Sequence, residues 1–131
     1  MEMKKLLESF NHAINGIIDA VRTQRNMKIH IVAAIGVLIA CFFFDISKAE
    51  FLSLAITITM VISAELVNTA VEAAVDLNTN YYHPLAKVAK NTAAGAVLVT
   101  AINALLVGYI VFWDKLSNFS YEVVYKIKHS E

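Results

Sequence analysis

Four side chains that carry oxygen atoms recur along one segment of the chain: Glu65, Asn68, Glu72 and Asp76. Their spacings of three, four and four residues keep them within an arc of about 80° on an α-helix, which turns by about 100° per residue. Carboxylate oxygens are the ligands that hard divalent cations prefer, and Mg²⁺ is commonly held by one or two carboxylates together with substrate phosphates. The pattern therefore indicates chemistry that uses a divalent cation and a phosphate compound.

The rest of the sequence indicates that this helix lies in a membrane. Of the 131 residues 58% are hydrophobic, and no charged residue falls within 31–44, 51–64 or 92–113. About 20 helical residues cross a hydrocarbon core of roughly 30 Å, so these runs predict three transmembrane helices within 29–113. The 11 basic residues balance the 11 acidic ones, which argues against nucleic-acid binding. We expect a single all-α membrane domain over 1–131.

The two ends of the chain are less apolar than the three runs. Residues 1–28 place Leu6, Phe10, Ile14 and Ile17 at helical spacing, which predicts an amphipathic helix on the membrane surface. An ordinary amphipathic helix docked on the protein's own bundle is the alternative reading of this pattern. Residues 114–131 mix aromatic, aliphatic and charged side chains and are predicted to form an interfacial tail.

The basic residues predict the orientation of the chain. Arg22, Arg25 and Lys28 precede the first run, Lys87 and Lys90 lie between the second and the third, and residues 45–50 contain a single lysine. Because positive charge accumulates in cytoplasmic segments, the N-terminus is expected in the cytoplasm and the C-terminus outside.

This orientation sets the depth of the acidic side chains. Glu65 lies 14 residues after Phe51, about 21 Å along a helix and near the inner headgroup boundary, and Glu72 and Asp76 lie about 10 and 16 Å further toward the cytosol. An unpaired carboxylate within a membrane costs about 2.5–3.5 kcal/mol, so the side chains must face a bundle interior or a water-filled cleft. The arrangement suggests chemistry that joins a lipid to a soluble polyphosphate, although a stripe that only holds helices together is the simpler alternative.

A basic residue and a group of small residues follow in the chain. Lys90 precedes the third run directly, where exposed backbone N–H groups at a helix start favour phosphate, although a lysine there also commonly marks the end of a span. Alanines within 70–74 and 93–96 permit close helix contacts, which favours oligomerisation. The sequence contains no GxxxxGK[ST] loop, so a nucleotide is not expected to bind through a P-loop.

The segment from Glu65 to Asp76 resembles the signature of the small prokaryotic diacylglycerol kinase family, E-x-x-N-[ST]-A-x-E-x-x-x-D. The stretch of residues 89–97, AKNTAAGAV, is similar to that family's A-K-D-x-A-A-G-A-V, and the resemblance extends over about residues 9–113. The RNMKIH segment at 25–30 looks more like the Gram-positive branch, whose lipid is usually undecaprenol, than the branch that phosphorylates diacylglycerol.

The resemblance implies a homotrimer in a bacterial cytoplasmic membrane, with sites between protomers and MgATP as the phosphoryl donor. Glu65 would then be the general base on the lipid hydroxyl, and Asn68 would orient it. Glu72 would hold the metal, and Asp76 and Lys90, with the neighbouring Asn91, would bind the nucleotide. A non-catalytic helical membrane oligomer is the alternative from a different functional class.

Two positions depart from the pattern of the family. Gln24 stands where Gram-positive members usually carry a second metal-binding glutamate, and Asn91 stands where the family has aspartate. Each amide keeps a carbonyl oxygen but lacks the negative charge that binds a hard cation tightly. We therefore expect weaker metal and nucleotide binding than in a chain with both acids, in an enzyme that is either active or catalytically weakened or inactive.

Overall fold

The computed structural model describes residues 2–78 and 81–129 and is helical along nearly all of them. Its helices are α1 (Glu2–Thr23), α2 (Arg25–Phe43), α3 (Lys48–Asn78) and α4 (Pro84–Lys128). Three segments are long and apolar enough to cross a membrane: Arg25–Phe43, Lys48–Asn78 and Pro84–Tyr121. The prediction of an all-α chain with three helices able to span a membrane is confirmed. The asparagine-rich sequence at 78–80 also predicts a turn, and its residues 79–80 lie outside the described residues.

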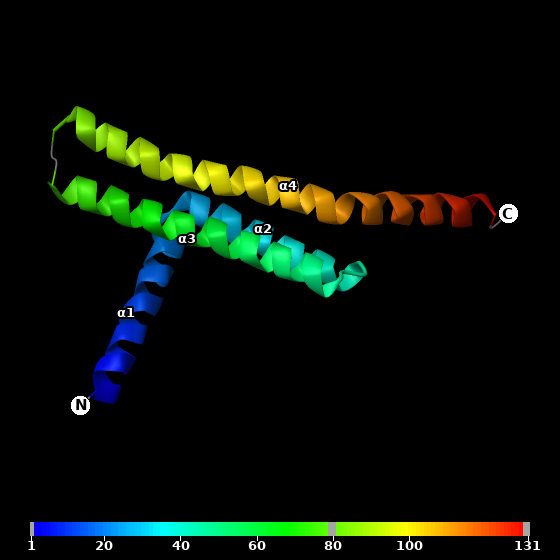
Figure 1. The fold of residues 1–131 in the computed structure, drawn as a ribbon, viewed down its shortest axis with the longest axis horizontal. Coiled ribbons are helices and arrows are strands. Elements are labelled where there is room, and N and C mark those ends of the chain that lie inside the picture. Colours follow the sequence, from blue (N-terminus) through cyan, green and yellow to red (C-terminus); the bar gives the residue numbers. More distant parts are fainter. Residues whose placement is uncertain (1, 79–80, 130–131) are drawn as a thin grey trace.

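The chain bends sharply between α1 and α2. Gln24 has an extended backbone, with φ −94° and ψ 121°, which ends one helix and begins the next. Ala20 and Met27 lie on either side of this bend and are fully buried. As a result, α1 leaves the bundle at an angle (Figure 1), and its large apolar side chains, such as Phe10 and Ile14, remain exposed.

Local side-chain contacts fix where α3 and α4 begin. Ser47 and Glu50 form a capping box, because the Ser47 N–H donates to Glu50 Oε2 at 2.8 Å and the Glu50 N–H donates to Ser47 Oγ at 3.3 Å. At the start of α4, His83 Nδ1 accepts from the Leu85 N–H at 3.2 Å. Pro84, whose fixed φ suits the first helical position, follows directly.

The antiparallel pair of α3 and α4 forms the centre of the bundle, and α2 packs against α3 (Figure 1). Leu54 and Val61 of α3 and Val97 and Val111 of α4 are buried there. The interior between the helices is narrow, and most other large apolar side chains are exposed in the single chain. Exposed aliphatic side chains over three long helices suit a hydrocarbon solvent.

The far part of α4 is joined to the α2–α3 connection, at what we call the α2–α3 end of the bundle. Lys115 Nζ lies 3.2 Å from Glu50 Oε1 and donates to the Asp45 carbonyl at 2.7 Å. The ring of Phe44 packs edge-on against Phe112 and Phe119. Helix α4 continues without a break into the segment expected to be an interfacial tail from residue 114, as far as Lys128.

We predict that Lys115→Met loosens this end of the bundle. The half-buried amine bonds both a carboxylate and a carbonyl, so its loss is expected to cost about 1 kcal/mol. Amides of residues 44–47 should exchange hydrogen faster, and the melting temperature in detergent should fall slightly. Lys128→Met, at the exposed end of α4, is the control. Equal exchange at residues 44–47 in the two variants would show that Lys115 does not secure the connection.

Candidate functional site

The acidic side chains of α3 border a cleft of about 300 Å³ between α2, α3 and α4, which we call the polar cleft. Its lining is Asn26, Ile29 and His30 of α2, Glu65, Asn68 and Glu72 of α3, and Ala94, Val97, Leu98 and Ala101 of α4. Helix α3 provides the carboxylates, α2 provides further polar groups, and α4 provides small and aliphatic side chains. Three of the four residues of the predicted stripe therefore face the inside of the bundle, and Asp76 does not line this cleft.

Two oxygen atoms in this cleft have no hydrogen-bond partner among the described residues. Glu65 is 1% exposed and Asn68 is 5% exposed, and Glu65 Oε2 and Asn68 Oδ1 are both buried and unpaired. The amide nitrogen of Asn68 donates to Glu72 Oε1 at 3.1 Å, which turns the amide oxygen away from that carboxylate. Buried polar atoms without a partner are rare in native proteins because each costs about 1–3 kcal/mol. A hydroxyl donor suits the first oxygen, and a donor or a cation suits the second.

Helix α2 contributes a titratable group that the sequence reasoning did not assign to the site. His30 is half-buried and lines the polar cleft, where it and Glu72 interact electrostatically with the Glu65 carboxylate. Asn26 lines the same cleft one helical turn earlier. The spacing of four residues between them, on one face of a helix, was a signal in the sequence. It could not be assigned before the packing of α2 against α3 was known.

The remaining predicted nucleotide residues border a second cleft, of about 260 Å³, between the end of α3 and the start of α4. Lys90 Nζ and Asp76 Oδ1 form an ion pair across the two helices at 2.5 Å, and Asn91 lines the same cleft. We call this the lysine cleft. The Lys90 side chain is 37% exposed and that of Asp76 is 64% exposed, so both groups are accessible to a water-soluble ligand.

Gln24 does not line either of these clefts. It is half-buried at the bend between α1 and α2 and is not among the residues that line the polar cleft. Within residues 2–78 and 81–129, no three His, Cys, Asp or Glu side chains gather as a metal site. The single chain thus brings Glu65, Asn68 and Glu72 together, and separately Asp76, Lys90 and Asn91, while Gln24 lines neither cleft.

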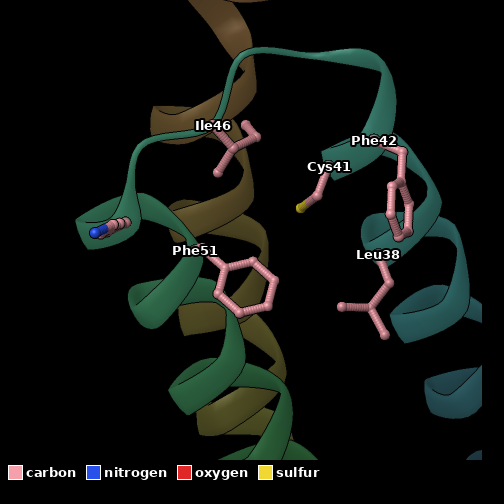
Figure 2. Close-up of a pocket in the computed structure, with 6 residues that line it drawn as sticks. Leu38, Cys41, Phe42, Ile46 and Phe51 are labelled. Carbon is pink, nitrogen blue, oxygen red and sulfur yellow. The ribbon is translucent and has the colours of Figure 1, made fainter.

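A different kind of cavity lies at the α2–α3 end of the bundle. It has a volume of about 490 Å³, and Leu38, Cys41 and Phe42 of α2 line it opposite Ile46 and Phe51 (Figure 2). Lys48 is the charged residue in its lining, and no carboxylate borders it. This cavity therefore lacks the carboxylates that would hold a divalent cation.

Known proteins are similar to this chain over most of its length. The sequence model of the prokaryotic diacylglycerol kinase family matches residues 11–112. The chain is 44% identical over 115 residues to an undecaprenol kinase of Bacillus subtilis, covering 88% of this chain and 94% of that protein.

Two diacylglycerol kinases are also similar. That of Synechocystis is 44% identical over 104 residues, which cover 79% of this chain and 59% of that protein. That of Escherichia coli is 32% identical over 80 residues, which cover 61% of this chain and 65% of that protein. The match to the Bacillus protein extends over nearly its whole length and supports the undecaprenol kinase branch. The chain belongs to the prokaryotic diacylglycerol kinase family, a family of lipid kinases.

Proposed function

We propose that this chain transfers the γ-phosphoryl group of ATP to the hydroxyl of a membrane polyprenol, with undecaprenol as the acceptor. The observation that carries the proposal is the unpaired, buried Glu65 Oε2 in the polar cleft. A carboxylate kept without a partner in an apolar bundle is costly, and a hydroxyl group on a lipid is the donor that would satisfy it. The similarity to an undecaprenol kinase favours the polyprenol, and the similarity to two diacylglycerol kinases makes diacylglycerol the alternative.

The proposed reaction uses Glu65 as a general base. Its carboxylate accepts the hydroxyl proton while the lipid oxygen forms a bond to the γ-phosphorus. The bond between that phosphorus and the bridging oxygen breaks, and ADP leaves with the electron pair. Asn68, held by its bond to Glu72, orients the reacting hydroxyl. Positioning and neutralisation of charge provide most of the catalysis in phosphoryl transfer, so this small set of side chains is sufficient.

The donor atoms of the polar cleft fit a magnesium ion held together with phosphates. Glu72 has a carboxylate there, and the neighbouring Asn68 has an unpaired amide oxygen. Glu72 and Gln24 are the proposed metal residues. Gln24 precedes Asn26, which lines the polar cleft, by two residues. Bound Mg²⁺ would supply positive charge to the transferring phosphate.

The lysine cleft is proposed to hold the nucleotide. Lys90 would contact the phosphates, and Asp76 fixes the position of its amine through the ion pair. Asn91, at the edge of the same cleft, would contribute hydrogen bonds without charge. The accessibility of both charged side chains to water supports binding of a cytosolic ligand.

The assembly that we propose is a homotrimer in the bacterial cytoplasmic membrane. The N-terminus and the α3–α4 connection would lie in the cytoplasm and the C-terminus outside, as the basic residues near them favour. Helix α1 would lie on the inner membrane surface, because its apolar face is exposed and its polar face carries charges. The open polar cleft of the single chain supports sites completed between protomers.

The direct test is phosphorylation by purified protein in lipid vesicles with labelled MgATP. We expect labelled undecaprenyl phosphate, and we expect undecaprenol to outcompete diacylglycerol when both are present. Preferential labelling of diacylglycerol would assign the chain to the alternative substrate. Absence of any labelled lipid, both from this chain and from its Gln24→Glu, Asn91→Asp variant, would exclude the kinase activity.

The role of Glu65 can be tested with Glu65→Gln, which preserves the shape of the side chain. We expect turnover to fall by about 10²–10⁴, the usual contribution of a general base, while native mass spectrometry shows an unchanged assembly. Asp114→Asn, which removes an exposed carboxylate on α4, controls for the loss of charge. Full turnover in Glu65→Gln would contradict the base, and an altered assembly would favour the non-catalytic oligomer.

Restoring the two family acids should strengthen metal and nucleotide binding. For Gln24→Glu with Asn91→Asp we expect the KM for MgATP to fall by about tenfold, because each new carboxylate offers a charged ligand to the cation. Titration of Mg²⁺ and ATP in the kinase assay measures the change. Gln24→Ala with Asn91→Ala is the matched control, and equal KM values in the parent and the acidic variant would contradict a role for these positions.

A further inference from the structure

An apolar groove continues from the polar cleft between α2 and α4, with α3 as its floor. It has a volume of about 270 Å³ and shares Ile29, His30 and Ala101 with the polar cleft. Beyond these shared residues its lining is entirely aliphatic, and it includes Ala34 on α2 and Ala104 on α4. Polar and apolar linings therefore meet within one continuous space.

The groove runs away from Glu65 toward the α2–α3 end of the bundle. Along α3 its floor includes Val61 and Ile58, which lies seven residues, or about 10 Å, from Glu65. Along α2 its wall extends from His30 to Val37, a similar distance. A molecule with a hydroxyl at Glu65 and an apolar chain would find a matching surface in this direction.

We propose that this groove receives the part of a single polyprenyl chain nearest the hydroxyl, and that the small side chains of Ala34 and Ala104 set its width for that chain. The inference rests on the proposed function, which places the lipid hydroxyl at Glu65. It adds a specificity-determining role for two alanines that carry no chemistry themselves.

The dimensions favour one chain rather than two. A buried apolar cavity of about 150 Å³ holds a six-carbon ring, so the groove, at about 270 Å³, has room for about ten carbons, or two isoprene units. A diacylglycerol carries two chains that separate close to the hydroxyl, and a groove of this volume fits only one of them. A leucine at either alanine would add three carbons and occupy much of the space that one isoprene unit needs.

Photolabelling of the full chain in phosphatidylethanolamine and phosphatidylglycerol vesicles tests occupancy without requiring activity. The probe is a twenty-carbon polyprenol with a diazirine on its second isoprene unit. We expect label within residues 33–37 and 101–105, competed by undecaprenol. Ala34→Leu and Ala104→Leu should reduce it about tenfold, with Ala34→Val as a milder variant should either fail to fold.

Ala40→Leu is the matched control, because this half-buried alanine lies on α2 outside the groove lining. It should label like the parent. Label confined to other segments, or equal label in the groove variants and the control, would overturn the inference. So would a disulfide between two protomers of an Ala34→Cys, Cys41→Ser variant, which would show that a second copy lies at the groove.

Kinetics separate this inference from the proposed function. In the leucine variants we expect kcat/KM for the twenty-carbon alcohol to fall about tenfold relative to that for a five-carbon prenyl alcohol, which is too short to extend along the groove. Equal losses for both alcohols would indicate a general structural effect and contradict the width-setting role. Specific groove labelling without phosphorylation of any alcohol would support the groove and refute the kinase activity.

Discussion

The structure depends on keeping the Glu65 carboxylate inside an apolar helical bundle. Glu65 is 1% exposed, and one of its oxygens has no partner among the described residues. Such a group is tolerated in a membrane helix only where it faces the interior or a cleft. This requirement fixes the rotation of α3, because turning it would expose Glu65 and Asn68 to hydrocarbon. The positions of α2 and α4 follow, since both helices must leave room beside these side chains.

The neighbouring helices meet this requirement in different ways. Helix α4 presents Ala94 and Ala101 to the polar cleft, and their small side chains leave space. Helix α2 presents His30, which interacts electrostatically with the Glu65 carboxylate. Asn68 bonds Glu72 but not Glu65, so the proposed base remains available. At this level of the bundle, α4 leaves space, α2 provides His30, and Glu65 keeps an oxygen free to accept a hydrogen bond. The aliphatic groove begins on one side of this level, and the exposed charges of the lysine cleft lie on the other.

The sequence was sufficient to predict what depends on periodicity and composition. The three uncharged runs predicted the three helices that can span a membrane. The spacing of Glu65, Asn68 and Glu72 predicted that these side chains share one face, directed inward. The bend at Gln24 was not predicted, because residues 17–28 contain no proline or glycine to mark a break and the break accompanies the burial of Ala20 and Met27. Residues 114–131 were expected to form an interfacial tail, and α4 continues through them to Lys128, with Lys115 bonded to Glu50 and Asp45. Contacts between distant residues, including the place of His30, are not present in local sequence.

A single uninterrupted helix also fixes the order of the proposed chemistry. On α3 the proposed base, metal residue and nucleotide residue follow one another at Glu65, Glu72 and Asp76, about 10 and then 6 Å apart along the axis. Because α3 has no break between Lys48 and Asn78, these separations cannot change without bending the helix. The ion pair between Asp76 and Lys90 holds the start of α4 beside the end of α3. Movement that brings lipid and nucleotide together must therefore come from α1, α2 or a neighbouring protomer. Helices α1 and α2 meet at the bend at Gln24, which is itself a proposed metal residue.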